Sequence, residues 1–259
     1  MNTNARRVAA AIALIGTGLA AACSTGAEDD TLTVCTNTPF VPFESQEDGE
    51  YVGFDIDLMQ LLADRLDQRM EVVEIDFDSI QSGSALDSGT CDIAAAGITI
   101  TEQRQQAMGM SQAYYRADQA FVTTEDADIA SLDDLADTRV AVQSATTGEA
   151  YADSIADRYG FEVVRFDTMG AIASALSSDS AQASIADLAT WTRMVESDSG
   201  LVLVDAIETD EHYGFAVQRD DTELLEEVNA MLDQAFEDGT YAELYEQWIG
   251  EPYTEGSVD

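Results

Sequence analysis

Three side chains have the chemistry and the placement to bind charged groups of a small molecule. Arg104 follows segment 99–103 at a predicted helix start, and a guanidinium holds a carboxylate by two parallel hydrogen bonds. Thr147 lies where a predicted strand meets a helix, so its N–H group can point at an anion. Asp187 directly follows an apolar strand, where a cleft would open. The alternatives are a surface Arg104 paired with an acid and helix-capping roles for the other two.

The elements that must position these residues alternate between strand and helix, and the alternation occurs twice. This rhythm predicts parallel α/β sheets. The extended segments 121–124 and 213–217 flank the second unit and are predicted to cross between lobes. Apolar faces predict two final helices, over 224–236 and 241–249. The predicted strands are 32–36, 71–77, 92–98, 139–143, 161–166 and 183–186, and the predicted helices begin at 55 and span 80–88, 148–159 and 169–177.

This order predicts an α/β fold of two lobes with two hinge crossings and a ligand cleft between the lobes. We assign the first lobe to residues 32–121 and 215–251, because the last helices return to it. The second lobe with its hinge segments takes residues 122–214. Residues 252–259 form a C-terminal tail.

The N-terminus is typical of an exported lipoprotein. Arg6 and Arg7 precede a short apolar run and a set of small residues, so residues 1–22 are predicted to be a signal peptide. The following Cys23 resembles the cysteine of a lipoprotein cleavage box, which becomes the lipidated first residue. Residues 23–31 then form an acidic tether, too polar to fold. The alternative is ordinary cleavage that leaves Cys23 unmodified.

Acidic residues dominate the composition. The 259 residues carry 51 acids and 11 basic residues, all of them Arg, for a formal net charge of -40. Such a surface repels phosphate backbones, which argues against nucleic-acid binding. A saline habitat and a need for solubility are alternative explanations of this acidic excess. Because no phosphate loop or metal-ligand cluster occurs, we expect no cofactor and no metal site.

Two further cysteines, Cys35 and Cys91, lie in predicted strands. Outside the cytoplasm thiols tend to pair, and neighbouring strands could bring them within disulfide range. We expect a disulfide between them; the alternative is two buried free thiols.

Seven segments between about residues 32 and 251 resemble those of a known family and occur in the same order as in that family. The chain resembles the periplasmic and lipoprotein amino-acid-binding proteins of ABC importers (solute-binding protein family 3), the type that includes glutamine- and lysine/arginine/ornithine-binding proteins. The resemblance implies a two-lobe periplasmic-binding-protein fold of type II. The segments are 38–44, 51–58, 76–79, 96–104, 140–149, 185–187 and 239–248.

The resemblance also implies how an amino acid is held. Arg104, Thr99 and Thr147 match positions that bind the ligand carboxylate. Asp187 matches the anionic partner of the ligand ammonium group, and the Gly97 carbonyl is a second acceptor.

Phe40 and Phe77 match two aromatic residues that enclose the aliphatic part of the ligand; without the resemblance both would be core residues. Asn37 matches a position that is often Asp when the ligand side chain is cationic or carries an amide, and Gln143 faces the same region. We therefore expect a polar, uncharged amino acid, with cyclic zwitterions such as ectoine as an alternative. The family commonly has Gly where Ala145 stands.

The resemblance implies a monomeric binding protein, outside the cytoplasm, that is anchored to the cell membrane by its N-terminal lipid alone and delivers a small zwitterion to an ABC permease. Two alternatives use the same fold: a sensor lobe for a separate receptor and a dehydratase of cyclic carboxylates. With one His, no Lys and no activated cysteine, we expect no enzymatic activity.

Overall fold

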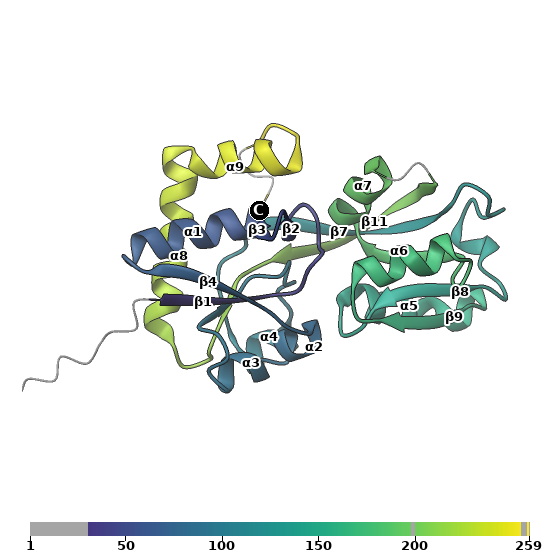
Figure 1. The fold of residues 1–259 in the computed structure, drawn as a ribbon. Helices are drawn as coiled ribbons and strands as arrows, with labels where there is room; N and C mark the ends of the chain where they lie inside the picture. Colours follow the sequence, from purple (N-terminus) through teal and green to yellow (C-terminus); the bar gives the residue numbers. More distant parts are fainter. Residues whose placement is uncertain (1–30, 198–199, 255–257, 259) are drawn as a thin grey trace, which may run out of the picture.

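The computed structural model describes residues 31–197, 200–254 and 258, which form two lobes joined by two long strands (Figure 1). Each lobe contains one open five-stranded sheet. A separate hairpin of β2 (Ser45–Glu47) and β3 (Glu50–Val52) turns at Asp48 and Gly49. Within the described residues, no helix is both long enough and apolar enough to cross a membrane.

The first lobe is built on a sheet in the order β4-β1-β5-β12-β6. Strand β1 pairs in parallel with β4 and with the central strand β5, while β12 pairs antiparallel with β5 and β6. The structure joins Cys35 of β1 to Cys91 in a disulfide with a Cα–Cα distance of 5.6 Å. The strands are β1 (Thr31–Thr36), β4 (Arg69–Glu74), β5 (Ile93–Ala94), β6 (Gly109–Met110) and β12 (Ala216–Val217).

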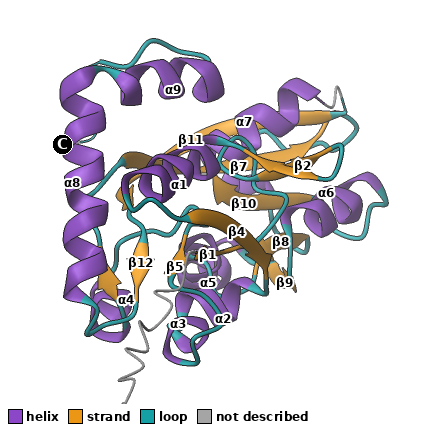
Figure 2. Ribbon diagram, turned by 60° about the vertical axis from the view of Figure 1, so that its left-hand side comes forward, coloured by secondary structure: helices purple, strands orange, loops and turns teal. Residues whose placement is uncertain are grey.

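Helices from both ends of the described chain complete the first lobe. The α1 helix buries Leu58, Met59 and Leu62, which recur at helical spacing, and contacts α8 and α9 (Figure 2). Asp57 of α1 accepts a hydrogen bond from Trp248 Nε1 of α9 at 2.7 Å. The helices are α1 (Phe54–Arg65), α2 (Phe77–Gln81), α3 (Ser84–Asp87), α4 (Glu102–Ala107), α8 (Thr222–Asp238) and α9 (Thr240–Ile249).

The second lobe has the sheet order β11-β7-β10-β8-β9. The strands β8, β9 and β10 run parallel, and β7 runs antiparallel to both β10 and β11. Its strands are β7 (Tyr115–Thr124), β8 (Arg139–Gln143), β9 (Glu162–Phe166), β10 (Ala183–Asp187) and β11 (Leu201–Tyr213). Its helices are the 3-10 turn Leu132–Asp134, α5 (Thr147–Tyr159), α6 (Met169–Ser177) and α7 (Leu188–Ser197).

The strands β7 and β11 form the link between the lobes (Figure 1). They pair along their lengths, from Leu201 opposite Thr124 to Tyr213 opposite Tyr115. The pairing register shifts twice along β11, so this strand carries extra residues. The lobe boundaries at residues 121, 122, 214 and 215 stay a prediction.

The sheets differ from the parallel sheets that we expected. Strands β7, β11 and β12 run antiparallel to their neighbours because the chain passes from one lobe to the other and back. The expected strand 92–98 pairs only at Ile93–Ala94; beyond it the backbone turns at Gly97, whose φ is 54°. Asp187 is the last residue of β10 and does not follow the strand.

Two helical predictions also need correction. The expected helix 80–88 is two short helices, broken at Gly83, whose φ of 78° is left-handed. Phe77 begins α2 and does not end a strand.

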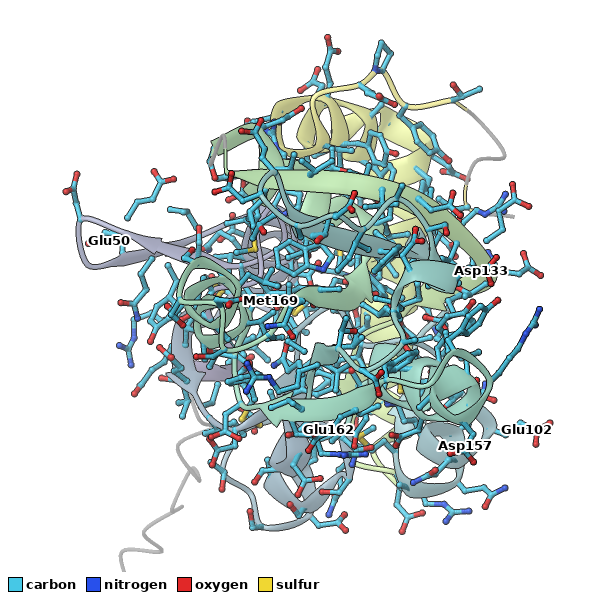
Figure 3. All side chains as sticks on the ribbon, turned by 90° about the vertical axis from the view of Figure 1, so that its right-hand side faces the viewer. Glu50, Glu102, Asp133, Asp157, Glu162 and Met169 are labelled. Atoms are coloured by element: carbon cyan, nitrogen blue, oxygen red, sulfur yellow. A yellow bond between two sulfur atoms is a disulfide. The ribbon has the colours of Figure 1, made fainter. Side chains whose placement is uncertain are left out.

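The acidic side chains lie mainly on the outside. Glu50, Glu102, Asp133 and Asp157 are exposed and project from the periphery (Figure 3). The predicted signal peptide, Cys23 and most of the predicted tether lie outside the described residues.

Candidate functional site

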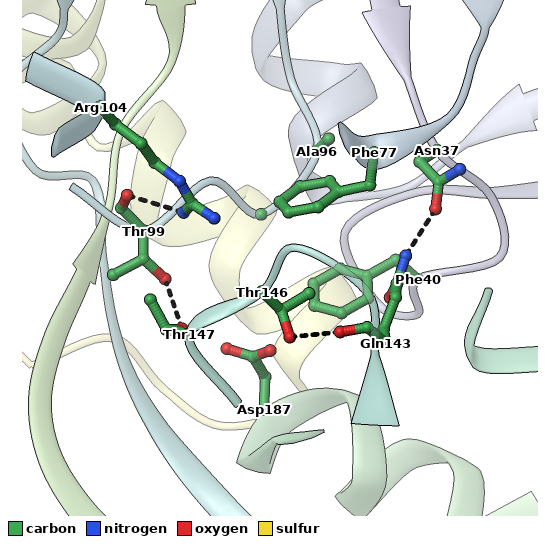
Figure 4. A pocket seen from close by; sticks show the side chains of 11 residues that line it. Asn37, Phe40, Phe77, Ala96, Thr99, Arg104, Gln143, Thr146, Thr147 and Asp187 are labelled. Atoms are coloured by element: carbon green, nitrogen blue, oxygen red, sulfur yellow. Dashed lines mark hydrogen bonds between the residues drawn. The ribbon is translucent and has the colours of Figure 1, made fainter. Parts of the chain in front are cut away.

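One pocket between the lobes collects every side chain that we predicted as a ligand contact (Figure 4). Ala96 and Thr146 line it as well, and neither was predicted. The role of each residue in binding stays a prediction. The nine predicted residues are Asn37, Phe40, Phe77, Gly97, Thr99, Arg104, Gln143, Thr147 and Asp187.

Arg104 provides a buried positive charge, with 4% of its surface exposed. It lies in α4, where the Thr101 hydroxyl accepts its backbone N–H at 3.2 Å. The guanidinium donates to the Thr99 carbonyl at 2.9 Å and, across the cleft, to the Ala145 carbonyl at 3.2 Å. Its Cζ atom lies 5.3 Å from the centre of the Phe77 ring. Burial lowers the pKa of Arg104 to about 10, so the side chain remains a cation at neutral pH.

Asp187 provides the opposite charge from the second lobe. Its Oδ1 accepts hydrogen bonds from the Tyr213 hydroxyl at 2.7 Å and from Gln119 Nε2 at 3.3 Å. Burial raises the pKa of Asp187 to about 6, and the Tyr213 hydrogen bond opposes that rise. The carboxyl is therefore mostly ionised at neutral pH and can hold a cationic group.

Two threonine hydroxyls face each other between these charges. Thr99 Oγ1 of the first lobe lies 3.4 Å from Thr147 Oγ1 of the second lobe. Thr147 is the first residue of α5, and the Thr146 hydroxyl caps this helix by accepting from the backbone N–H of Glu149 at 3.1 Å. A helix N-terminus with free N–H groups favours an anion. Ala145 takes a left-handed φ of 65°, a conformation that suits the Gly common at this position in the resembled family.

Amide side chains close the other end of the pocket. Gln143 Nε2 donates to Asn37 Oδ1 across the cleft at 2.8 Å and also to the Asp167 carbonyl at 3.1 Å. Asn37 Nδ2 donates to the Ile75 carbonyl at 2.9 Å, which fixes the orientation of its amide. The pocket therefore ends in neutral polar groups.

The two phenylalanines and the Gly97 turn form the apolar wall. A Cβ atom at Gly97 would lie 2.4 Å from Phe40 Cε1, so only glycine fits there. The Gly97 N–H donates to Asp55 Oδ2 at 3.1 Å, and the Tyr114 hydroxyl donates to Asp55 Oδ1 at 2.6 Å. Burial raises the pKa of Asp55 to about 6, while these two hydrogen bonds oppose the rise. Asp55 thus holds the turn in place from behind the pocket.

Several residues of this region were missed by the sequence analysis. Thr146 could have been found, because Thr146 and Glu149 form the Thr-x-x-Glu pattern of a capping box. Gln119, Glu211 and Tyr213 come from the two hinge strands and carry no motif of their own. The pairing of β7 with both β10 and β11 brings them behind Asp187 and Thr147.

Comparison with known proteins identifies the same family that the sequence motifs resemble. The model of the bacterial extracellular solute-binding proteins, family 3, matches residues 32–251. The arginine-binding extracellular protein ArtP of Bacillus subtilis is 30% identical, over 84% of this chain and 86% of ArtP. A probable histidine-binding protein of Neisseria gonorrhoeae is 28% identical, over 90% of this chain and 88% of its own length.

Solved structures agree with this result. An ancestral arginine-binding protein bound to arginine superposes with a TM-score of 0.79 at 37% identity and covers 85% of this chain and 98% of its own. An ancestral arginine-binding protein bound to glutamine gives 0.80 at 37% identity, with coverages of 86% and 99%. An ancestral amino-acid-binding protein described as a precursor of cyclohexadienyl dehydratase gives 0.78 at 35% identity, with coverages of 85% and 96%. The chain therefore belongs to the bacterial extracellular solute-binding proteins, family 3.

Proposed function

We propose that this protein binds an amino acid in the pocket between its lobes and delivers it to the permease of an ABC importer. The observation that carries the proposal is the pair of opposite charges in one pocket: Arg104 from the first lobe and Asp187 from the second. An amino acid needs such a pair, because its carboxylate and its ammonium group lie on one carbon atom. Relatives named as arginine-, histidine- and glutamine-binding proteins support this ligand class.

The carboxylate of the ligand would be held at the Arg104 end. The guanidinium already lies between the lobes, and α5 begins there with Thr147. Thr99 and the α5 N-terminus supply neutral donors to the same group. The ammonium group would be held by Asp187, whose position is fixed by Tyr213. Burial strengthens both interactions, because water competes less in a closed pocket.

The ligand side chain would extend toward Asn37 and Gln143, between Phe40 and Phe77. Because these two amides are neutral, the pocket offers a cationic side chain hydrogen bonds without a charge partner at this end. We therefore assign a polar, uncharged amino acid such as glutamine as the preferred ligand. A cyclic zwitterion is the second candidate.

Binding would proceed by closure of the cleft. The ligand first contacts Arg104 on the first lobe, and the second lobe then brings Thr147 and Asp187. The contacts from Gln143 to Asn37 and from Arg104 to the Ala145 carbonyl join the lobes in this arrangement. The strands β7 and β11 would absorb the movement, because they connect the lobes.

The protein would act outside the cytoplasm as a monomer, anchored to the cell membrane by a lipid on Cys23. The basic and apolar character of residues 1–22 supports export, and relatives are named as extracellular or periplasmic. A Cys23→Ala variant should lose the lipid and move from the membrane fraction to the soluble fraction. If it stays with the membrane, the anchor lies elsewhere.

Transport fits the pocket better than the two alternatives. An enzyme needs an acid or base beside a reacting bond, whereas the two charged side chains that line this pocket, Arg104 and Asp187, match the two charges of a zwitterion. The relatives reported above are binding proteins. A sensor lobe would use the same cleft, with a separate receptor in place of the permease.

A thermal-shift screen of the mature protein without Cys23, against the twenty amino acids and a few cyclic zwitterions, tests the proposal. A ligand that binds only the folded state raises the melting temperature. Arg104→Ala should lose this shift, because the buried carboxylate loses its charge partner at about 2–5 kcal/mol. Arg158→Ala, an exposed arginine of α5, is the matched control and should keep it. The proposal fails if no compound stabilises the wild type or if Arg104→Ala binds equally well.

A further inference from the structure

One carboxylate outside the predicted site contacts both lobes and both hinge strands. Glu211 Oε2, on β11, accepts a hydrogen bond from Thr147 Oγ1 of the second lobe at 2.9 Å. The same oxygen accepts from Gln119 Nε2 of β7 at 3.1 Å. It also lies 3.5 Å from Thr99 Oγ1 of the first lobe, a longer and weaker contact. A single oxygen atom is thus the common acceptor for groups from three parts of the fold.

The local structure of β11 directs Glu211 to this position. Side chains alternate along a strand, so Glu211 and Tyr213 face the pocket while His212 faces away. The His212 carbonyl accepts the Ile100 N–H at 2.8 Å, which ties this part of β11 to the first lobe. Just before Glu211 the strand bulges, and Asp118 Oδ1 accepts the Thr209 N–H at 3.0 Å. The backbone is therefore fixed by hydrogen bonds on both sides of Glu211, at Thr209 and at His212.

The pocket gives Glu211 no charge partner of its own at hydrogen-bond distance among the described residues. Its three contacts are neutral donors, and its charge favours the protonated form of Arg104. An ionised acceptor forms stronger hydrogen bonds than a neutral one. Gln119 belongs to the same sheet as Glu211, and Thr147 to the same lobe, so the contact with Thr99 is the one that crosses to the first lobe, and its free energy is available when the lobes meet.

We propose that Glu211 is a positioning residue for cleft closure: it holds the hydroxyls of Thr99 and Thr147 together when the lobes meet. It acts through these two residues and does not line the pocket. This inference rests on the proposed function in that closure serves amino-acid binding. We therefore expect that loss of the carboxylate opens the cleft while the protein stays folded.

The test measures the distance between the lobes. Spin labels at positions 102 and 157, exposed on α4 and α5, report this distance by pulsed electron resonance. The measurements compare the wild type, Glu211→Ala, Glu211→Gln and the matched control Glu208→Ala, an exposed glutamate on the same strand. Each is measured alone and with L-arginine, L-histidine or L-glutamine. Melting temperatures verify that every variant is folded.

We expect Glu211→Ala to shift the distances toward longer values with and without amino acid. Glu211→Gln, which keeps one neutral acceptor oxygen, should lie between it and the wild type, and Glu208→Ala should match the wild type. Glu211→Ala should also weaken affinity roughly tenfold, as expected for a lost hydrogen bond to a charged group. Equal distances in wild type and Glu211→Ala, both folded, would overturn the inference.

A double-mutant cycle with Thr147→Val separates coupling from general damage. Thr147→Val should weaken affinity roughly tenfold in the wild type but clearly less in Glu211→Ala, because the shared bond is already lost. Additive effects would contradict the inference. If the wild type binds none of the three amino acids, the proposed function is in question, while the distances without amino acid still decide the role of Glu211.

Discussion

The pH dependence of amino-acid affinity is a direct test of the charge arrangement in the pocket. Burial raises the pKa of Asp187 to about 6. The ammonium group of a free amino acid stays protonated well above that pH, so it needs the ionised form of Asp187. Only the ionised fraction of the protein is competent to bind, and affinity should fall as the pH drops through this pKa.

The size of the effect follows from the pKa. At about pH 5 a carboxyl with a pKa of about 6 is ionised in roughly one molecule in eleven, and at about pH 7.5 in nearly all. The apparent Kd should therefore weaken roughly tenfold, or about 1.4 kcal/mol, between these two values. Titration calorimetry with an amino acid found in the thermal-shift screen measures this change.

Two variants identify the group responsible. Asp187→Asn should bind more weakly at neutral pH but lose most of the pH dependence, because the titrating group is gone. Asp55 has a similar pKa and holds the Gly97 turn, so Asp55→Asn shows whether this second carboxyl contributes. A Kd of the wild type that stays constant between about pH 7.5 and about pH 5 would refute the assignment of Asp187 to the ammonium group.

Three further predictions concern stability. Replacing both Cys35 and Cys91 by Ala should lower the unfolding free energy by about 2–4 kcal/mol, measured by urea unfolding; an unchanged midpoint would contradict it. Gly97→Ala should lower the melting temperature and weaken binding, because its Cβ would meet the Phe40 ring; wild-type values of both would contradict this. The unfolding free energy should rise as the pH falls from about 6 toward about 4, because buried Asp55 holds its proton more tightly when folded, and Asp55→Asn should reduce this rise.

The site could be predicted because its residues stand at the ends of regular elements. Arg104 and Thr147 lie at helix starts, and Asp187 ends a strand, so the topology alone brings them toward one cleft. The family resemblance supplied Asn37 and Gln143, which have no chemical signal of their own. These local features need no knowledge of long-range pairing.

The hinge could not be predicted in the same way. The strand β11 runs for 13 residues, yet we expected only its last residue, Tyr213, to be extended. Its sequence from Asp205 to His212 is rich in acids and resembles a loop. Pairing with β7 overrides that local preference, and long-range pairing is what a single sequence shows least. Glu211 was missed for this reason.

The return of α8 and α9 to the first lobe also sets the order in which the chain can fold as it is synthesised or, as proposed above, exported. Residues 31–110 cannot complete their lobe until residues 222–249 have emerged, because α1 packs against α8 and α9. The second lobe is nearly continuous in sequence and can fold as soon as β11 is available. In the export that we propose, a chain that is still crossing the membrane would therefore keep its first lobe unfolded and able to be translocated. A chain cut short before residue 222 would leave the apolar face of α1 exposed to proteases.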